Sequence, residues 1–320
     1  MKRVDIIVPC YNESEVITMF YENADKVLSE ITSYKFEFIF IDDGSSDDTI
    51  DKIKGFAKKD KRVKYISFSR NFGKEAAMYA GMKNSGGDYV LIIDADMQHP
   101  IELIHDMLSA VEEGYDCCAA FRATRKGDPL LRTFFTRQFY KFTNKISDVN
   151  MPDGAGDFRL MNRNMINAVV AMSEVQRFSK GIFSWVGFRT KWINFENIER
   201  AAGQTKWSFW KLFMYAIDGI TAFSTAPLRF ASVVGSFVSL SAFVFLIYII
   251  IKTLIFGPDV GGYASTITVI LFIGGIIILS CGILGEYVAK IYMEVKNRPI
   301  YITKTSNIGE SSGEDKDGDN

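Results

Sequence analysis

The sequence YVLIIDADMQHP, residues 89–100, decides the fold, because it joins an apolar run directly to a pair of carboxylates. The run from Tyr89 to Ile93 is uncharged and is typical of a strand buried in a parallel sheet. Asp94 and Asp96 follow one residue apart, and alternate side chains of an extended chain point to the same side. Together with a diphosphate, two such carboxylates form the oxygen site that Mg²⁺ or Mn²⁺ prefers. A lone Asp-x-Asp is also compatible with a solvated turn, so the rest of the sequence decides between the two interpretations.

Strand-like and helix-like stretches alternate through the first part of the chain. The strands are expected at residues 4–8, 36–41, 63–68, 89–93 and 116–121, and the helices at 14–31, 48–58 and 73–84. This alternation indicates an α/β fold with a doubly wound, mainly parallel sheet. In such sheets ligands bind beyond the carboxyl ends of the strands, where this sequence places Pro9 to Glu13, Asp42 to Ser45 and Asp94 to Asp96. We therefore expect one shared polar site at this edge of the sheet.

Composition excludes several other classes of protein. The formal net charge of the 320 residues is -1, so bulk charge gives no indication of nucleic-acid binding. The sequence contains neither GxGxxG nor GxxxxGK[ST], so it has neither a dinucleotide fingerprint nor a P-loop. Its four cysteines have no CxxC spacing, and its two histidines are too few for a histidine-based zinc site. The phosphates of any bound nucleotide would therefore need a metal ion and basic side chains.

Four motifs, in their order and spacing, resemble those of family 2 glycosyltransferases with the Rossmann-like GT-A fold. They are VPCYNE at 8–13, IDDGSSD at 41–47, NFGK at 71–74 and DADMQHP at 94–100. The resemblance implies a nucleotide-sugar donor. It implies that the base and ribose of this donor are contacted by Pro9, Tyr11, Glu13 and Asp43. It also implies that the metal and the diphosphate are contacted by Asp94, Asp96 and Gln98.

A basic and aromatic stretch follows the fifth expected strand. We expect a helix from about residue 129 to 146 that carries cationic and aromatic side chains together. Such a helix suits an anionic membrane surface, where its arginines would meet phosphate. The alternative is an ordinary amphipathic helix with a solvated charged face, and a nucleic-acid surface has no other support in the chain. We count Arg122 among the catalytic residues. We expect the acceptor phosphate to be bound by Arg125, Arg132 and Arg137.

Two further segments resemble parts of polyprenyl-phosphate glycosyltransferases. The turn DGAGDFRLM at 153–161 is similar to the segment that supplies an acidic residue beside the transferred sugar, which here is Asp157. A structural hydrogen bond at a strand entrance is the alternative for this aspartate. The stretch ERAAGQTKW at 199–207 is similar to the family's R-x-x-G-x-[ST]-K pattern, which makes Arg200 and Lys206 candidates for contacts with the donor phosphates or the acceptor. It departs from the QxxRW motif of processive synthases, which argues against polymer synthesis.

The C-terminal third is apolar enough to enter a membrane. Residues 230–251 and 264–285 each give 22 positions without a charge, which exceeds the roughly 20 needed to cross a hydrocarbon core. Basic residues flank this hairpin, whereas Lys252 is the only basic residue in its connecting loop. The positive-inside rule therefore places both ends of the hairpin in the cytoplasm. A pair of buried core helices is the rarer alternative.

These patterns predict a multi-pass protein of the cell (inner or plasma) membrane, with a chain of four parts. The parts are a cytoplasmic catalytic domain at 1–206, an interfacial amphipathic helix at 207–228, a transmembrane hairpin at 229–290 and a cytoplasmic tail at 291–320 with a disordered acidic end. Gly274 and Gly275 in the second span suit close helix packing, and with the resemblance they leave a homo-oligomer open.

The whole layout resembles the GtrB-like bactoprenol glucosyltransferases over residues 1 to about 304, and the dolichyl-phosphate mannose synthases over the catalytic part. The resemblance implies an inverting transfer of glucose from UDP-glucose to undecaprenyl phosphate, with Mg²⁺ or Mn²⁺ at the leaving diphosphate. Asp96 and Asp157 are counted as catalytic, and Asp157 would act as a base, position the acceptor or stabilise the oxocarbenium-like centre. GDP-mannose as donor, a processive synthase and a non-enzymatic membrane scaffold are the alternatives.

Overall fold

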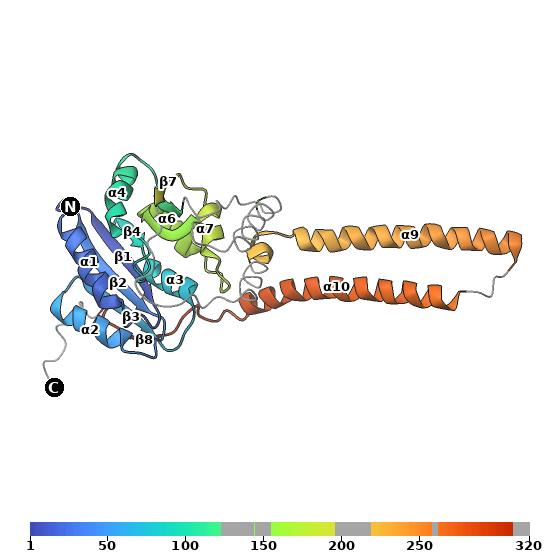
Figure 1. Cartoon of the computed structure of the whole chain (residues 1–320), viewed down its shortest axis with the longest axis horizontal. Coiled ribbons are helices and arrows are strands. Elements are labelled where there is room, and N and C mark those ends of the chain that lie inside the picture. The colour runs from blue at the N-terminus through green and yellow to red at the C-terminus, as the bar shows by residue number, and fades with distance from the viewer. Residues whose placement is uncertain (123–143, 145–154, 196–218, 258–261, 310–320) are drawn as a thin grey trace, which may run out of the picture.

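The computed structural model describes residues 1–122, 144, 155–195, 219–257 and 262–309. Within them the chain folds into an α/β domain, and two long helices project from one end of it (Figure 1). The predicted fold class is confirmed. Almost all of the helix expected at 129–146, much of the interfacial helix expected at 207–228 and the acidic end of the chain lie outside the described residues.

Among the described residues the domain is built on one sheet of eight strands, in the order β7-β5-β6-β4-β1-β2-β3-β8. The strands are β1 Arg3–Cys10, β2 Lys35–Asp42, β3 Val63–Phe68, β4 Tyr89–Ile92, β5 Cys117–Arg122, β6 Ala155–Asn162, β7 Thr190–Phe195 and β8 Thr303–Ser306. β1 pairs in parallel with β2 and β4, β2 with β3, and β5 with β7. β6 runs antiparallel between β4 and β5, so its first residues lie at the carboxyl end of β4.

Helices cover both faces of the sheet, as in other doubly wound folds. They are α1 Ile17–Ser29, α2 Thr49–Lys59, α3 Lys74–Asn84, the short η1 Ile101–Leu103, α4 Ile104–Glu112, α6 Arg163–Ala171 and α7 Ser179–Trp185. Apolar side chains of α1, α2 and α4 pack on one face together with Phe38 and Phe40 of β2. Those of α3, α6 and α7 pack on the other face with Ile39 and Ile41. Successive residues of β2 thus enter opposite cores, which is why residues 38–41 of this strand are all apolar.

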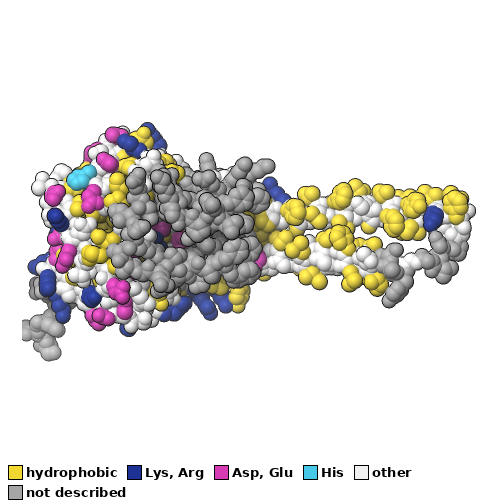
Figure 2. Space-filling model, viewed as in Figure 1, with side chains coloured by type: hydrophobic (Ala, Val, Ile, Leu, Met, Phe, Trp, Pro, Cys, Tyr) yellow, Lys and Arg dark blue, Asp and Glu magenta, His cyan; other side chains and the backbone are white. Residues whose placement is uncertain are grey.

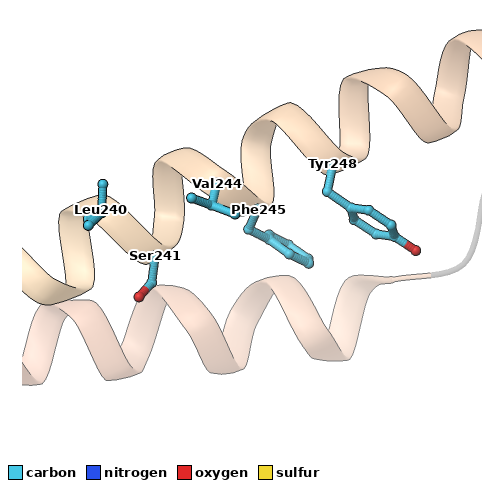
Figure 3. A pocket seen from close by; sticks show the side chains of 5 residues that line it. All are labelled: Leu240, Ser241, Val244, Phe245 and Tyr248. Carbon is cyan, nitrogen blue, oxygen red and sulfur yellow. The ribbon is translucent and has the colours of Figure 1, made fainter.

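The two projecting helices are α9 Ala226–Phe256 and α10 Tyr263–Val295. Their most apolar windows reach mean hydropathies of 2.5 and 2.8, and hydrophobic side chains are exposed along both (Figure 2). An exposed apolar surface of this extent marks an interaction site, and helices of 31 and 33 residues are long enough to cross a bilayer. Both expected spans lie within them. A shallow groove midway along α9, beside α10, is lined by Leu240, Ser241, Val244, Phe245 and Tyr248 (Figure 3).

The chain after α10 returns to the sheet, an arrangement that the sequence did not indicate. β8 pairs antiparallel with β3 at the sheet edge, and the ring of Tyr301 stacks on Phe68 with centroids 4.9 Å apart. The Asn307 side chain accepts the N–H of Tyr65 at 2.7 Å and donates to the carbonyl of Val63 at 3.1 Å. These contacts fasten the end of the hairpin to the sheet that carries the candidate site.

The base of the hairpin also contacts the domain directly. The Glu294 carboxylate on α10 accepts the backbone N–H of Val175, just before α7, at 2.9 Å. The Tyr287 hydroxyl donates to the carbonyl of Ser224, just before α9, at 2.6 Å. The start of α9 and the end of α10 are therefore joined to each other and to the α7 side of the domain.

Candidate active site

The turns after β1 and β2 are joined by hydrogen bonds. Asn12 follows β1 with a positive φ of 53°, which is uncommon for a residue other than glycine. Its side-chain oxygen accepts the N–H of Ser46 at 2.8 Å, and its own N–H donates to the Ser45 hydroxyl at 3.0 Å. The segment Pro9 to Glu13 is thus fixed against the turn after β2, and Tyr11 within it is 43% exposed. The strand ends that the sequence predicted to be neighbours do meet.

Asp43, in the turn after β2, determines where α3 begins. Its buried carboxylate accepts the backbone N–H groups of Phe72 at 2.6 Å and Gly73 at 2.9 Å. Burial raises the pKa of Asp43, and the two N–H groups oppose this rise because they stabilise the charged form. Gly44 permits the turn, since its φ is 68° and a Cβ there would lie 2.4 Å from the carbonyl carbon of Arg70.

Lys74, the first residue of α3, joins two of the expected site carboxylates. Its Nζ lies 2.7 Å from Asp94 Oδ1 and 2.7 Å from Asp157 Oδ2. The antiparallel pairing of β4 with β6 explains why they meet. Ile92 lies opposite Arg159, so two positions beyond this pair Asp94 approaches Asp157. The sequence indicated no role for Lys74 within its NFGK motif.

The charges of this cluster stabilise one another. Although burial works against the charge of Lys74, Asp157 and Asp94 raise its pKa above the ordinary value. Burial also opposes the charge of Asp157, but Lys74 and then Lys180 hold its pKa well below the usual range. The side chains keep partial access to solvent, with exposed fractions of 41% for Lys74, 25% for Asp94 and 17% for Asp157. A ligand can therefore reach an ionised cluster.

Asp96 and Gln98 lie in the turn after Asp94. The Asp96 carboxylate accepts the N–H of Gln98 at 3.1 Å, and Met97 between them has a positive φ of 60°. The described parts of the chain contain no group of three or more His, Cys, Asp or Glu residues that could hold a metal ion by themselves. Two carboxylates still fit Mg²⁺ or Mn²⁺, because one or two suffice where substrate phosphates and water supply the remaining oxygens.

Glu75 is a neighbour of the site that the sequence did not indicate. Its carboxylate accepts both the hydroxyl proton of Ser179, at the start of α7, and the backbone N–H of that residue at 3.0 Å. Burial first, and then the nearby charge of Asp157, raise the pKa of Glu75 to about 7. The start of α3 is thus held from two sides, by Asp43 and by Ser179. The sequence signal for Glu75 was no more than its place directly after a motif.

Six of the expected site residues cannot be placed with their side chains. For Arg122 the backbone alone is described, at the end of β5. Outside the described residues lie Arg125, Arg132, Arg137, Arg200 and Lys206. Their roles stay predictions.

Comparison with known proteins gives the family. The family model of glycosyl transferase family 2 matches residues 5–170, and that of the GtrB C-terminal hairpin matches residues 226–291. The chain belongs to glycosyl transferase family 2. The first match covers the strands and helices that carry Asp43, Lys74, Asp94 and Asp157, and the second covers α9 and most of α10. The protein is therefore a glycosyltransferase that associates with a membrane through its hairpin.

Relatives of this glycosyltransferase match over nearly its whole length. The putative glycosyltransferase CsbB of Bacillus subtilis is 46% identical and covers 95% of this chain and 92% of its own. The SfII prophage-derived bactoprenol glucosyl transferase of Shigella flexneri is 42% identical, over 96% of this chain and 99% of its own. Among solved structures, S. aureus TarS in complex with UDP-GlcNAc has a TM-score of 0.46 at 16% identity, covering 69% of this chain and 66% of that chain. The resemblance to GtrB-like family 2 enzymes is confirmed.

Proposed function

We propose that this glycosyltransferase moves glucose from UDP-glucose onto undecaprenyl phosphate or a similar polyprenyl phosphate, with inversion at the anomeric carbon. The observation that carries the proposal is the convergence of Asp94 and Asp157 on Lys74, at a sheet edge connected to the base of an apolar hairpin. The names of relatives agree with it, since several of them are called bactoprenol glucosyl transferase.

A short series of contacts connects the site with the hairpin. Glu75 accepts hydrogen bonds from Ser179. Phe178, which precedes Ser179 in the chain, packs against Phe223 with ring centroids 6.1 Å apart. Phe223 precedes α9, and on α10 Glu294 accepts a backbone N–H from the segment before α7. A polyprenyl phosphate keeps its tail in the bilayer and presents its phosphate at headgroup level. The layout suits such an acceptor, whereas a freely diffusing sugar acceptor would not require it.

The donor nucleotide would lie along the turns after β1 and β2. Around its base and ribose we place Pro9, Tyr11, Glu13 and Asp43. Asp43 already accepts two backbone N–H groups, but each carboxylate oxygen has a second lone pair that can accept a ribose hydroxyl. Asp43 would therefore hold the start of α3 and the ribose together.

The diphosphate of the donor would lie over the turn after β4. Mg²⁺ or Mn²⁺ would be held there by Asp94, Asp96 and Gln98. When bound, such an ion supplies positive charge that stabilises the leaving diphosphate. Arg200 and Lys206 would add hydrogen-bond donors to the phosphate oxygens.

Asp157 would position the reacting groups and stabilise charge, and would not serve as the base. Although burial opposes its charge, Lys74 holds the pKa of Asp157 well below the usual range, and such a group is a poor general base near neutral pH. The acceptor needs no base, because a phosphate monoester with a second pKa near 6 is already largely ionised. In the transfer, an acceptor phosphate oxygen bonds to the anomeric carbon, the bond from that carbon to the diphosphate oxygen breaks, and UDP leaves. The Asp157 carboxylate would stabilise the positive charge that develops on the sugar.

The membrane arrangement is proposed from the charge pattern of the sequence. We place the domain at 1–206 and the tail at 291–320 in the cytoplasm, residues 207–228 at the interface, and the hairpin at 229–290 across the plasma membrane. At headgroup level, the acceptor phosphate would meet Arg122, Arg125, Arg132 and Arg137. Self-association through the small residues of the second span is compatible with this arrangement.

A transfer assay with the full chain in liposomes tests the proposed function. The liposomes contain undecaprenyl phosphate with Mg²⁺ or Mn²⁺, and separate reactions receive labelled UDP-glucose, UDP-galactose, UDP-GlcNAc or GDP-mannose. We expect UDP-glucose to label the organic extract, and no label when the unphosphorylated polyprenol replaces the phosphate. Label from another donor would overturn the assignment of glucose and keep the reaction class. Folded protein that forms no lipid product with any donor would overturn the proposal.

A further inference from the structure

The proposed metal ligand Asp94 already contacts a cation that belongs to the chain. Lys74 Nζ lies 2.7 Å from Asp94 Oδ1, 2.8 Å from Asp94 Oδ2 and 2.7 Å from Asp157 Oδ2. An ammonium group has three N–H donors, and these contacts can use all of them. Lys74 thereby offsets one of the two negative charges of Asp94 and Asp157 and bridges carboxylates that would otherwise repel each other.

The position of Lys74 is set by the fold on both sides along the chain. Gly73, with a φ of 97°, donates its N–H to Asp43 at 2.9 Å. Glu75 accepts the N–H of Ser179 at 3.0 Å. The backbone of Lys74 is therefore fixed on both sides, and its flexible side chain is held at the other end by Asp94 and Asp157.

We propose that Lys74 is an internal counter-ion that competes with the divalent metal for Asp94 and stays with Asp157 when Asp94 turns to the metal. The inference rests on the proposed function, because it takes Asp94 as a metal ligand. Lys74 contacts both oxygens of Asp94, and an ammonium so close to a divalent cation is repelled by it. Asp94 therefore exchanges its partner, while Lys74 keeps Asp157 ionised and gains free N–H donors for a phosphate oxygen of the substrate.

Mn²⁺ binding to the full-length protein in detergent, with no nucleotide sugar or lipid phosphate added, tests the exchange. Free Mn²⁺ is followed by electron paramagnetic resonance in the wild type, Lys74→Met and Lys74→Arg. Methionine has a similar length and no charge. We therefore expect Lys74→Met to bind Mn²⁺ at least about tenfold more tightly than the wild type. This size follows from the effect of one nearby charge on the binding of another cation, the proton, whose pKa it shifts by about one unit or more. Lys74→Arg keeps the charge and should bind like the wild type. Asp96→Asn added to Lys74→Met should abolish the gain.

The two proposals fail in distinguishable ways. Equal or weaker Mn²⁺ binding by Lys74→Met, in protein that still unfolds cooperatively, overturns the role of Lys74. If Lys74→Met does not fold, Lys74→Gln replaces it, with the same gain expected and the same result counting against it. Lipid-linked glucose formed by the wild type without a gain in Mn²⁺ binding sinks the counter-ion and leaves the proposed function standing. A gain in Mn²⁺ binding by Lys74→Met, with no lipid product from the wild type, supports the counter-ion and overturns the proposed function.

Discussion

Glu75→Gln tests whether the charges around the site are coupled as the structure indicates. The ordinary pKa of this carboxyl, 4.5, rises to about 7, because burial and then Asp157 disfavour its charge. The folded protein thus binds the proton more tightly than the unfolded chain. The resulting stability is present in full below about pH 4.5 and is lost as the pH rises through 7. One pKa unit corresponds to about 1.36 kcal/mol, so a rise from 4.5 to about 7 means that ionising Glu75 costs the folded state roughly 3 to 4 kcal/mol.

Glutamine keeps the size of the side chain and an oxygen that can accept both donors of Ser179, but it does not ionise. We therefore expect Glu75→Gln to gain thermal stability relative to the wild type between about pH 5 and about pH 8. The assay is thermal unfolding followed by tryptophan fluorescence in detergent at several pH values. Glu102→Gln, an exposed substitution in η1, is the matched control and should show no such trend. A difference between wild type and Glu75→Gln that does not change with pH would refute the reasoning.

Three further predictions concern how the site is held and filled. Asp43→Ala leaves two backbone N–H groups without their acceptor, and each loss should lower the free energy of unfolding by about 1–3 kcal/mol. The Tm of this variant should therefore fall, and its KM for the donor should rise. Unchanged values would contradict the role of Asp43 at the start of α3. Tyr301→Ala removes the ring stacked on Phe68 and should lower the stability of the domain by on the order of 2 kcal/mol, seen as a lower Tm of protein that still fractionates with membranes. A wild-type Tm would show that the segment after α10 does not stabilise the sheet. Removal of divalent ions with EDTA should abolish transfer, and added Mn²⁺ should restore it; transfer in EDTA would argue against the metal.

Most of the sheet could be predicted from the sequence because its central strands are buried on both faces. β1 to β5 overlap the mainly apolar runs that the sequence predicts as strands, and α1 to α3 begin and end within a few residues of the expected helices. β7 and β8 were missed because they form the two edges of the sheet. In β7 only Phe195 is buried and the other residues are half-buried or exposed, and β8 is short and polar. Their strand character is decided by partners that are remote in sequence, which no local pattern reports.

The aspartates of the candidate site were predicted from the sequence or the resemblance, whereas Lys74 and Glu75 were not. Asp94 and Asp96 were marked by their place after a buried strand. Asp157 could be joined to them only by resemblance, because their meeting depends on the antiparallel insertion of β6 beside β4. Lys74 and Glu75 look like ordinary solvated charges at a helix start. Their importance appears only in tertiary contacts, with Asp94 and Asp157 for the lysine and with α7 for the glutamate.

The most direct test of the central claim, that the ends of β4 and β6 form one transfer site, is the initial rate at which labelled glucose from UDP-glucose enters undecaprenyl phosphate. Asp96→Asn and Asp157→Asn are compared with Asp106→Asn, an exposed control on α4. We expect the control to keep the wild-type rate, and the two site variants to lose about a hundredfold or more. Asp96→Asn weakens the binding of the metal that stabilises the leaving diphosphate, and Asp157→Asn removes the charge that stabilises the positive charge developing on the sugar. A wild-type rate in either folded site variant would contradict the account.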